Sequence, residues 1–387
     1  MAVASLRDAA AESSSTCVVF DVAGLQALID ELIRRGYTVV GPTVREGGIV
    51  AAEIHSIDDL PRGVADHQQP GEYRLSESGA DEFFGFASGA TSWKPVLFPP
   101  RRMLWRHTTA AAPVPEPLDD TPRALLGVRA CDLRAIEVQD RVFADRAFID
   151  PDYVSRRRNT FIVAVTCGHP SQTCFCTSMG GGPKPSGGYD VLLTELVDDE
   201  GRRFVVDTGT AAGADVVAAI ASRPASSAER TAADDVAERA AARIERRVDT
   251  DGLRDRLYEA REHPQWDDIA SRCLSCGNCT LVCPTCFCVT TNDVEDLAGP
   301  VGRERVWDSC FVVEYSYIHG GPIRRSTQAR YRQWLTHKFA SWIDQFGTSG
   351  CVGCGRCVTW CPVGIDITEE LARLSVRPAT ASDKEGR

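Results

Sequence analysis

The sequence lacks several features that would place it in a common class of protein. No apolar run approaches the length of a membrane span, and residues 161–165 are short enough to be a buried strand. The first residues carry neither the positive region nor the long apolar region of a secretory signal. Lys plus Arg number 43 against 54 Asp plus Glu, and the net charge of −11 argues against nucleic acid or an anionic membrane as the main partner. We therefore expect a cytoplasmic protein without a membrane span.

The sequence also lacks a nucleotide-binding fingerprint. The glycine run at 180–182 does not follow the order G-x-G-x-x-G, and no P-loop Lys-Ser/Thr comes after it. We expect this run to form a turn, and we expect no NAD or FAD in a Rossmann crevice of this chain.

What the chain has in abundance is cysteine. Sixteen cysteines without an export signal favour metal ligation over disulfides. Two runs share the pattern C-x2-C-x2-C-x3-C-P, which holds 4Fe–4S clusters in bacterial ferredoxins. They are Cys273-Leu-Ser-Cys276-Gly-Asn-Cys279-Thr-Leu-Val-Cys283-Pro284 and Cys351-Val-Gly-Cys354-Gly-Arg-Cys357-Val-Thr-Trp-Cys361-Pro362.

The spacing of each run predicts a crossed ligand set. Three closely spaced cysteines can wrap one cubane, and the fourth, fixed by a proline, ligates the other cluster. The first cluster is then expected on Cys273, Cys276, Cys279 and Cys361, and the second on Cys283, Cys351, Cys354 and Cys357. Two zinc sites are the alternative, but zinc explains neither the third cysteine of each run nor the repeated proline. The pattern indicates an electron-transfer protein.

A second group of cysteines lies in the N-terminal half of the chain. Cys131 and Cys167 each follow a strand-like run, and Cys174-Phe175-Cys176 comes shortly afterwards. Cysteines that follow strand ends can converge at one edge of a sheet. Three interpretations stay open for these four residues: buried apolar cysteines, a four-thiolate zinc site, or a third cubane.

A third group of cysteines lies between the two ferredoxin runs. The tetrapeptide Thr-Cys-Phe-Cys at 173–176 occurs again at 285–288, and Cys310 follows. Cys286, Cys288 and Cys310 offer three thiolates, one short of a cubane, so structural burial is the favoured interpretation. The alternative is a catalytic site for polysulfide or disulfide chemistry.

The fold class expected from these patterns is α+β. Residues 1–16 form a flexible tail, and residues 17–205 form a mixed α/β domain with a helix at 25–33 and strands at 37–40, 49–54, 124–128, 161–165 and 191–193. Residues 95–100 should be extended. Residues 206–262 are a charged, solvated helical linker. Residues 263–387 are an α-helical ferredoxin domain carrying two cubanes, with an aromatic helical stripe over 331–346 that Gly347 closes.

Several blocks of the sequence resemble one family. They are Gly36-Tyr37-Thr-Val-Val-Gly41-Pro42, Gln69-Pro70-Gly71-Glu72-Tyr73-Arg74-Leu75, Gly127-Val-Arg-Ala-Cys131-Asp132-Leu133, Thr173-Cys174-Phe175-Cys176 and both ferredoxin runs. Together they resemble the beta subunits of cytoplasmic, NAD(P)-linked NiFe hydrogenases of the sulfhydrogenase type, and more distantly the electron-transfer subunit of anaerobic sulfite reductase. The Ala- and Arg-rich segment at 210–250 lies outside the resemblance.

The resemblance implies a four-subunit complex. A large subunit holds the NiFe site, a small subunit carries further clusters, and a flavoprotein binds FAD and NAD(P). The beta subunit would relay electrons between them without substrate chemistry of its own. The resemblance also favours a third 4Fe–4S cluster on Cys131, Cys167, Cys174 and Cys176. The alternative is the same relay in an anaerobic sulfite or sulfur reductase.

Overall fold

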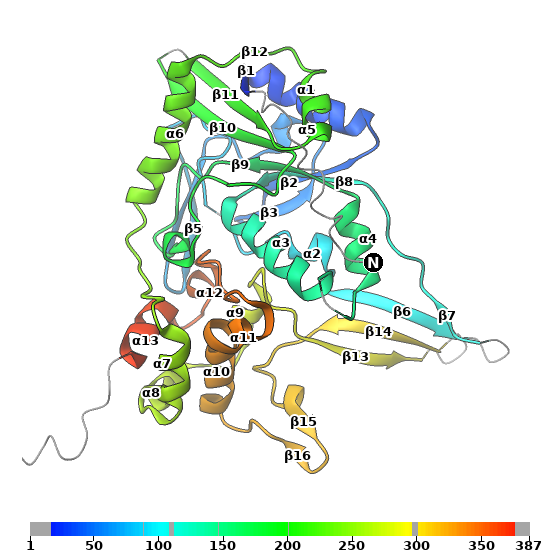
Figure 1. Cartoon of the computed structure of the whole chain (residues 1–387), viewed down its shortest axis with the longest axis vertical. Helices are drawn as coiled ribbons and strands as arrows, with labels where there is room; N and C mark the ends of the chain where they lie inside the picture. The colour runs from blue at the N-terminus through cyan, green and yellow to red at the C-terminus, as the bar shows by residue number, and fades with distance from the viewer. Residues whose placement is uncertain are drawn as a thin grey trace, which may run out of the picture.

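The computed structural model describes residues 17–87, 89–107, 112–145, 147–199, 201–295 and 301–375. A large mixed sheet forms the upper part of the molecule (Figure 1). Its order is β12 (Arg223–Pro224), β1 (Cys17–Phe20), β11 (Gly201–Thr208), β10 (Val191–Asp198), β9 (Thr160–Val165), β8 (Arg123–Val128), β2 (Thr38–Arg45) and β3 (Gly48–Glu53). The four strands from β10 to β2 are parallel, and the other pairings are antiparallel.

Helices cover both faces of this sheet. Helices α1 (Val22–Arg34) and α5 (Ala211–Val217) pack on one face, and α2 (Lys94–Leu97), α3 (Ala130–Phe143) and α4 (Pro151–Arg158) pack on the other. Successive residues of β8 point to opposite sides, so that Leu126 joins the first core and Leu125 the second. Burial on both faces explains the continuous apolar runs of the central strands. The predicted mixed α/β architecture of this part is confirmed.

The local predictions are confirmed where the periodicity is strong. The helix expected at 25–33 is α1, which Asp21 caps through its side chain and which ends before Gly36 at φ +87°. The extended segment expected at 95–100 is wrong, because residues 94–97 form α2. Pro95 lies in the first turn of that helix, where its missing N–H has no intrahelical partner to lose.

The segment expected to be a solvated linker differs from that expectation. Strand β11 runs to Thr208, and β12 adds to the edge of the large sheet beside β1. Helix α6 (Ser227–Ala242) then packs on the sheet through its small residues Ala233, Ala237 and Ala240. Alanines allow a close approach that the polar composition of the segment does not predict. Helix α7 (Leu253–Glu259) continues the chain toward the ferredoxin motifs.

Helices surround the two ferredoxin motifs in the lower part of the molecule (Figure 1). They are α8 (Gln265–Arg272), α9 (Asn278–Leu281), α10 (Thr327–Thr336), a π-helical turn (His337–Ser341), α11 (Trp342–Phe346), α12 (Arg356–Thr359) and α13 (Ile367–Leu374). The stripe predicted over 331–346 is buried in their common core, and Gly347 at φ +69° closes it. None of the helices in the described ranges is both long and apolar enough to cross a membrane.

Helices alone do not describe this region. Strands β13 (Val289–Val294) and β14 (Val301–Trp307) lie between the two motifs and form a four-stranded sheet with β6 (Arg101–His107) and β7 (Val114–Pro115). Two small hairpins complete the strands, β4 (Val64–Gln69) with β5 (Glu72–Glu77), and β15 (Tyr317–Ile318) with β16 (Gly321–Pro322). Single turns of 3-10 helix occur at Ile57–Asp59, Cys176–Met179, Ala260–Glu262 and Val313–Ser316. The two halves of the chain therefore share a sheet.

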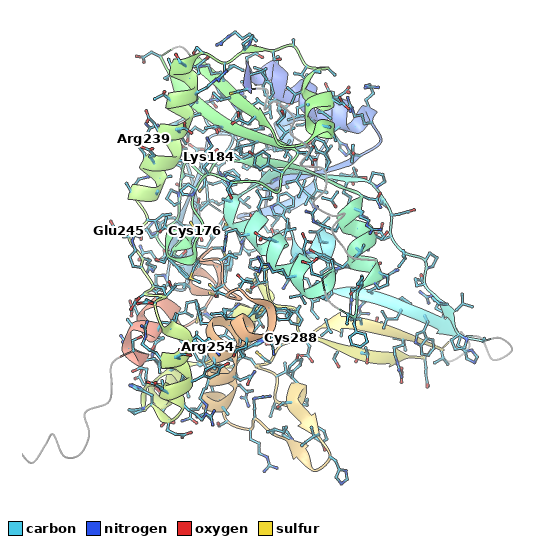
Figure 2. All side chains as sticks on the ribbon, viewed as in Figure 1. Cys176, Lys184, Arg239, Glu245, Arg254 and Cys288 are labelled. Atoms are coloured by element: carbon cyan, nitrogen blue, oxygen red, sulfur yellow. The ribbon has the colours of Figure 1, made fainter. Side chains whose placement is uncertain are left out.

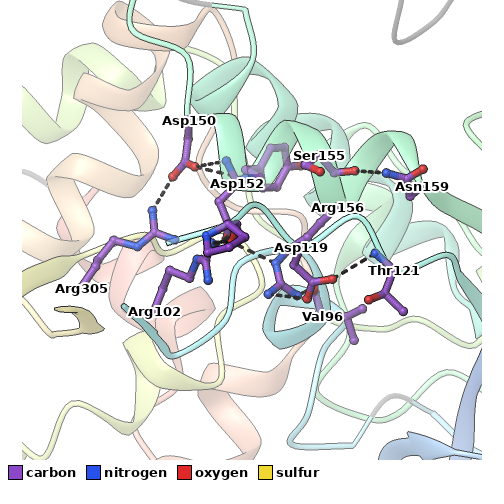
Figure 3. Close-up of polar contacts among 12 residues, drawn as sticks. Val96, Arg102, Asp119, Thr121, Asp150, Asp152, Ser155, Arg156, Asn159 and Arg305 are labelled. Atoms are coloured by element: carbon purple, nitrogen blue, oxygen red, sulfur yellow. Dashed lines mark hydrogen bonds and ion pairs between the residues drawn. The ribbon is translucent and has the colours of Figure 1, made fainter. Parts of the chain in front are cut away.

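Ion pairs fasten this shared sheet to α4 (Figure 3). Arg305 of β14 donates to Asp150, whose side chain also caps the N-terminus of α4. Arg102 of β6 pairs with Asp152 at 3.0 Å. All four side chains are mostly buried, so the contacts are screened less than surface ion pairs.

Candidate metal centres

The two ferredoxin motifs adopt the same backbone path. Ser275 and Gly277 of the first motif have φ of +53° and +77°, and Gly353 and Gly355 at the matching positions of the second have +68° and +77°. Each left-handed pair turns the chain so that the third cysteine of the motif falls in a short helix, α9 or α12. The two motifs are therefore a structural repeat, and α9 packs against α12.

The first cavity gathers the cysteines of the first predicted set. Cys273, Cys276, Cys279 and Cys361 all line it, and Cys357 reaches its edge. The cavity encloses about 410 Å³ free of protein atoms, its open mouth included. Its other walls are almost entirely apolar: Leu274, Phe311, Tyr331, Trp334, Val363, Ile365 and Ile367.

The second cavity gathers the second predicted set. Cys283, Cys351, Cys354 and Cys357 line about 290 Å³ of space together with Phe175 and Lys338. In both cavities, three cysteines of one motif meet the fourth cysteine of the other. In the described ranges no three His, Cys, Asp or Glu side chains lie close enough to hold a single metal ion, so the thiols surround cavities instead of a point.

The chemistry of these cavities fits an iron–sulfur cluster. Burial raises the pKa of Cys279 and Cys357 well above the ordinary value of a thiol, so bare thiolates are costly there and need a cation bound to them. Backbone N–H groups also point at sulfur. Ser275 donates to Cys273 at 3.4 Å, Gly353 to Cys351 at 3.4 Å and Ile365 to Cys361 at 3.3 Å. Such donors favour a negatively charged sulfur.

A buried lysine contacts the second cavity. Lys338 is 3 % exposed, and its ammonium donates to Gly350 O at 2.9 Å and to Cys283 Sγ at 3.2 Å. Burial alone lowers the pKa of Lys338, but the thiols of Cys283 and Cys286 raise it well above its ordinary value. Sequence reasoning missed this residue. A lysine inside an aromatic helical stripe was the available signal, and the π-helical turn is what aims it inward.

The N-terminal cysteines lie against the second motif. Cys131 falls in the first turn of α3 directly after β8, and Cys167 follows β9, so both leave the same edge of the sheet as predicted. The Thr173–Cys176 segment packs on Gly353 and Gly355, where a Cβ atom would come within 2.6 Å of backbone atoms of Cys176 and Thr173 respectively. Figure 2 shows Cys176 between the large sheet and the ferredoxin helices.

The structure brings the four N-terminal cysteines into one neighbourhood. Burial raises the pKa of Cys176 to about 12, with smaller contributions from the nearby thiols of Cys167 and Cys354. Cys174 is likewise influenced by Cys167 and Cys176, and Cys131 by Cys354 and Cys176. The glycine run at 180–182 forms the turn that follows, and Gly180 has φ +69°.

A buried ion pair joins the second motif to α3. The guanidinium of Arg356 lies 2.9 Å from the carboxylate of Asp132, and it also donates to Gly89 O at 3.0 Å. Nearby, Thr359 donates to the buried Gln68 at 2.9 Å. These contacts hold the N-terminal cysteines and the ferredoxin loop in one rigid arrangement. The sequence offered no signal for them, because their partners lie more than 200 positions apart.

The cysteines of the third group also meet. The Cys286 thiol hydrogen-bonds to Cys283, and with Lys338 it lowers the pKa of Cys283 well below its usual range. The thiols of Cys288 and Cys310 hydrogen-bond to each other. Of the two acid–base candidates near this group, Asp308 influences Cys288, and its own backbone N–H donates to Cys288 O at 2.9 Å.

Comparisons with known proteins agree with this geometry. Residues 272–365 match the family model of a 4Fe-4S dicluster domain. The chain is 32 % identical over 295 residues to the sulfhydrogenase 2 subunit beta of Pyrococcus furiosus, which covers 71 % of this chain and 82 % of the relative. No solved structure matches the chain. At this identity and coverage, the chain belongs to the family of sulfhydrogenase beta subunits.

Proposed function

We propose that this chain is the iron–sulfur electron-transfer component of a NiFe hydrogenase, relaying electrons between a flavin subunit that binds NAD(P) and the hydrogenase small subunit. The observation that carries the proposal is the crossed lining of the two cavities, each with three cysteines of one motif and one of the other. This is the ligand arrangement that two neighbouring 4Fe–4S clusters require in a ferredoxin. The name of the Pyrococcus relative, a beta subunit of a sulfhydrogenase, supports the assignment to such a complex.

The proposed ligands of the first cluster are Cys273, Cys276, Cys279 and Cys361, and those of the second are Cys283, Cys351, Cys354 and Cys357. A cluster held there supplies reversible one-electron transfer. The chain supplies the surroundings. Apolar walls exclude water from the first cavity, and backbone N–H groups donate to sulfur in both motifs. Lys338 adds a positive charge beside the second.

We further propose a third 4Fe–4S cluster on Cys131, Cys167, Cys174 and Cys176. Its support is the common neighbourhood of these thiols and their closeness to Cys354, a proposed ligand of the second cluster. The four residues come from the α3 N-terminus and from the loop after β9, which lie at one edge of the sheet. The N-terminal domain, proposed at 17–205, would then extend the relay beyond the ferredoxin domain at 263–387 toward a partner protein.

The experiment is purification of the tagged full-length chain from its native cells without oxygen. We expect the large and small hydrogenase subunits to copurify from the cytoplasm, together with a flavin-containing NAD(P) reductase. The isolated chain should carry at least about eight irons, as two cubanes require. Zinc near two with iron near zero would overturn the cluster assignment. Copurification of a sirohaem-containing sulfite reductase, without a NiFe protein, would overturn the hydrogenase assignment and leave the relay.

A further inference from the structure

Two cysteines that the relay does not use lie together at the base of the shared sheet. Cys288 directly precedes β13, and Cys310 follows β14 by three residues. Since Val289 pairs with Trp307 in the antiparallel register, both cysteines lie at the same end of the hairpin. Figure 2 shows Cys288 at this position, below α3 and beside the ferredoxin helices.

The two thiols contact each other directly. Cys288 accepts hydrogen bonds from the Cys310 thiol, from the Cys310 backbone N–H and from the Tyr315 hydroxyl. The thiol hydrogen bond from Cys310 is the main cause that lowers the pKa of Cys288 to about 6, and the same contact raises the pKa of Cys310. One sulfur is thus a nucleophilic thiolate and the other keeps its proton.

The third cysteine of the group is held apart from this pair. Cys286 hydrogen-bonds to Cys283 and lies 3.7 Å from the ammonium of Lys338. Phe287 anchors the intervening backbone, because its ring packs on Trp342 at 5.2 Å and on Phe143 at 5.9 Å. The arrangement therefore pairs Cys288 with Cys310 and leaves Cys286 as a donor to a proposed cluster ligand.

The position of the pair relates it to both cavities. Cys310 is close enough to Cys279 of the first cavity to be influenced by it, and Cys286 links it to Cys283 of the second. Both thiols remain partly exposed, and Tyr315 beside them is 39 % exposed. A small thiol reagent can therefore reach them from solvent.

We propose that Cys288 and Cys310 are a redox-active dithiol that closes reversibly to a disulfide, which adds a two-electron centre beside the proposed one-electron relay. With oxidised glutathione, the Cys288 thiolate attacks one sulfur and expels a glutathione thiolate. Cys310 then loses its proton and attacks Cys288 of the mixed disulfide, which expels the second glutathione. One S–S bond breaks and one forms, and two electrons pass from the protein to glutathione.

The test equilibrates the oxygen-free full-length chain with glutathione buffers that run from reduced to oxidised. Acid quenching, differential alkylation with light and heavy N-ethylmaleimide and peptide mass spectrometry then report each cysteine. We expect a Cys288–Cys310 disulfide whose oxidised-to-reduced ratio changes tenfold per about 30 mV, the slope of a two-electron couple. Cys288→Ser should abolish the cross-link. Cys17→Ser, which removes a cysteine hydrogen-bonded to Asp207 in the large sheet, should leave it unchanged.

Iron measured in the same samples separates this proposal from the relay. Full iron with both cysteines remaining thiols in every buffer would overturn the dithiol alone. A Cys288–Cys310 disulfide in a chain without iron would support the dithiol and remove the relay. Disulfides scattered over many cysteines, and still present in Cys288→Ser, would also overturn the dithiol.

Discussion

Replacing Lys338 with methionine should lower the reduction potential of the cluster proposed in the second cavity. The change removes one positive charge and keeps a side chain of similar length in the π-helical turn. In the parent chain the ammonium lies 3.2 Å from Cys283 Sγ and 3.7 Å from Cys286 Sγ. A positive charge there stabilises the added electron of the reduced cluster, and its loss favours the oxidised form.

The size of the shift follows from Coulomb's law. With an effective dielectric constant of about 20 and roughly 6 Å from the ammonium to the centre of the delocalised electron, the interaction is about 3 kcal/mol. For a one-electron couple this corresponds to ~120 mV. An electron confined to Cys283 Sγ, 3.2 Å away, would give about 5 kcal/mol, which sets an upper limit near ~220 mV.

The assay is a redox titration followed by electron paramagnetic resonance, with the parent chain and two further variants beside it. Lys338→Arg keeps the charge and should restore most of the potential. Lys184→Met removes a half-exposed lysine that pairs with Asp234 far from the cavity and should change nothing. An unchanged potential in Lys338→Met, with full iron content, would refute the reasoning. Loss of iron in Lys338→Met but not in Lys338→Arg would show that the charge holds the cluster itself.

Three further results are expected. Cys361→Ser should destroy the cluster signal of the first cavity, because Cys361 lines that cavity with Cys273, while the signal of the second persists; loss of the second signal alone would contradict the crossed assignment. Changing all four N-terminal cysteines to alanine in the full-length chain should remove about four irons, and an unchanged iron content would exclude the third cluster. Asp132→Asn leaves the Arg356 charge buried and unpaired and should cost about 3–5 kcal/mol in denaturant unfolding, whereas Asp344→Asn in an exposed pair should change stability little; equal effects of the two would refute the role of the buried pair.

Much of the site could be predicted because its chemistry is written locally. The spacing of each cysteine run is set by one turn of backbone around a cubane, and the crossed lining of the cavities is the arrangement that this spacing implies. Strong periodicity likewise located α1 and the strands β8 and β9. Where the pattern was weak, in residues 64–107, the strands β4 to β6 were missed.

The remainder depended on contacts between distant segments. Cys288 and Cys310 meet only because β13 and β14 form a hairpin, and their separation matches no motif. Lys338 looks like one more position of a helical stripe, since the π-helical turn that redirects it has no clear sequence signature. The packing of α6 on the sheet rests on three alanines, which contribute little to a hydrophobic pattern.

The pairing of β6 with β14 has a consequence for how the protein is made. Arg101 to His107 pair with Val301 to Val306, so a strand near the start of the chain waits for a partner near its end. At ordinary rates of translation, about 200 intervening residues take on the order of 10–40 s to emerge from the ribosome. During that time one edge of β6 is unpaired on the nascent chain and open to pairing with a strand of another polypeptide. Successful biogenesis thus rests on a chaperone shielding that edge, or on slow neighbours, until the last quarter of the polypeptide arrives.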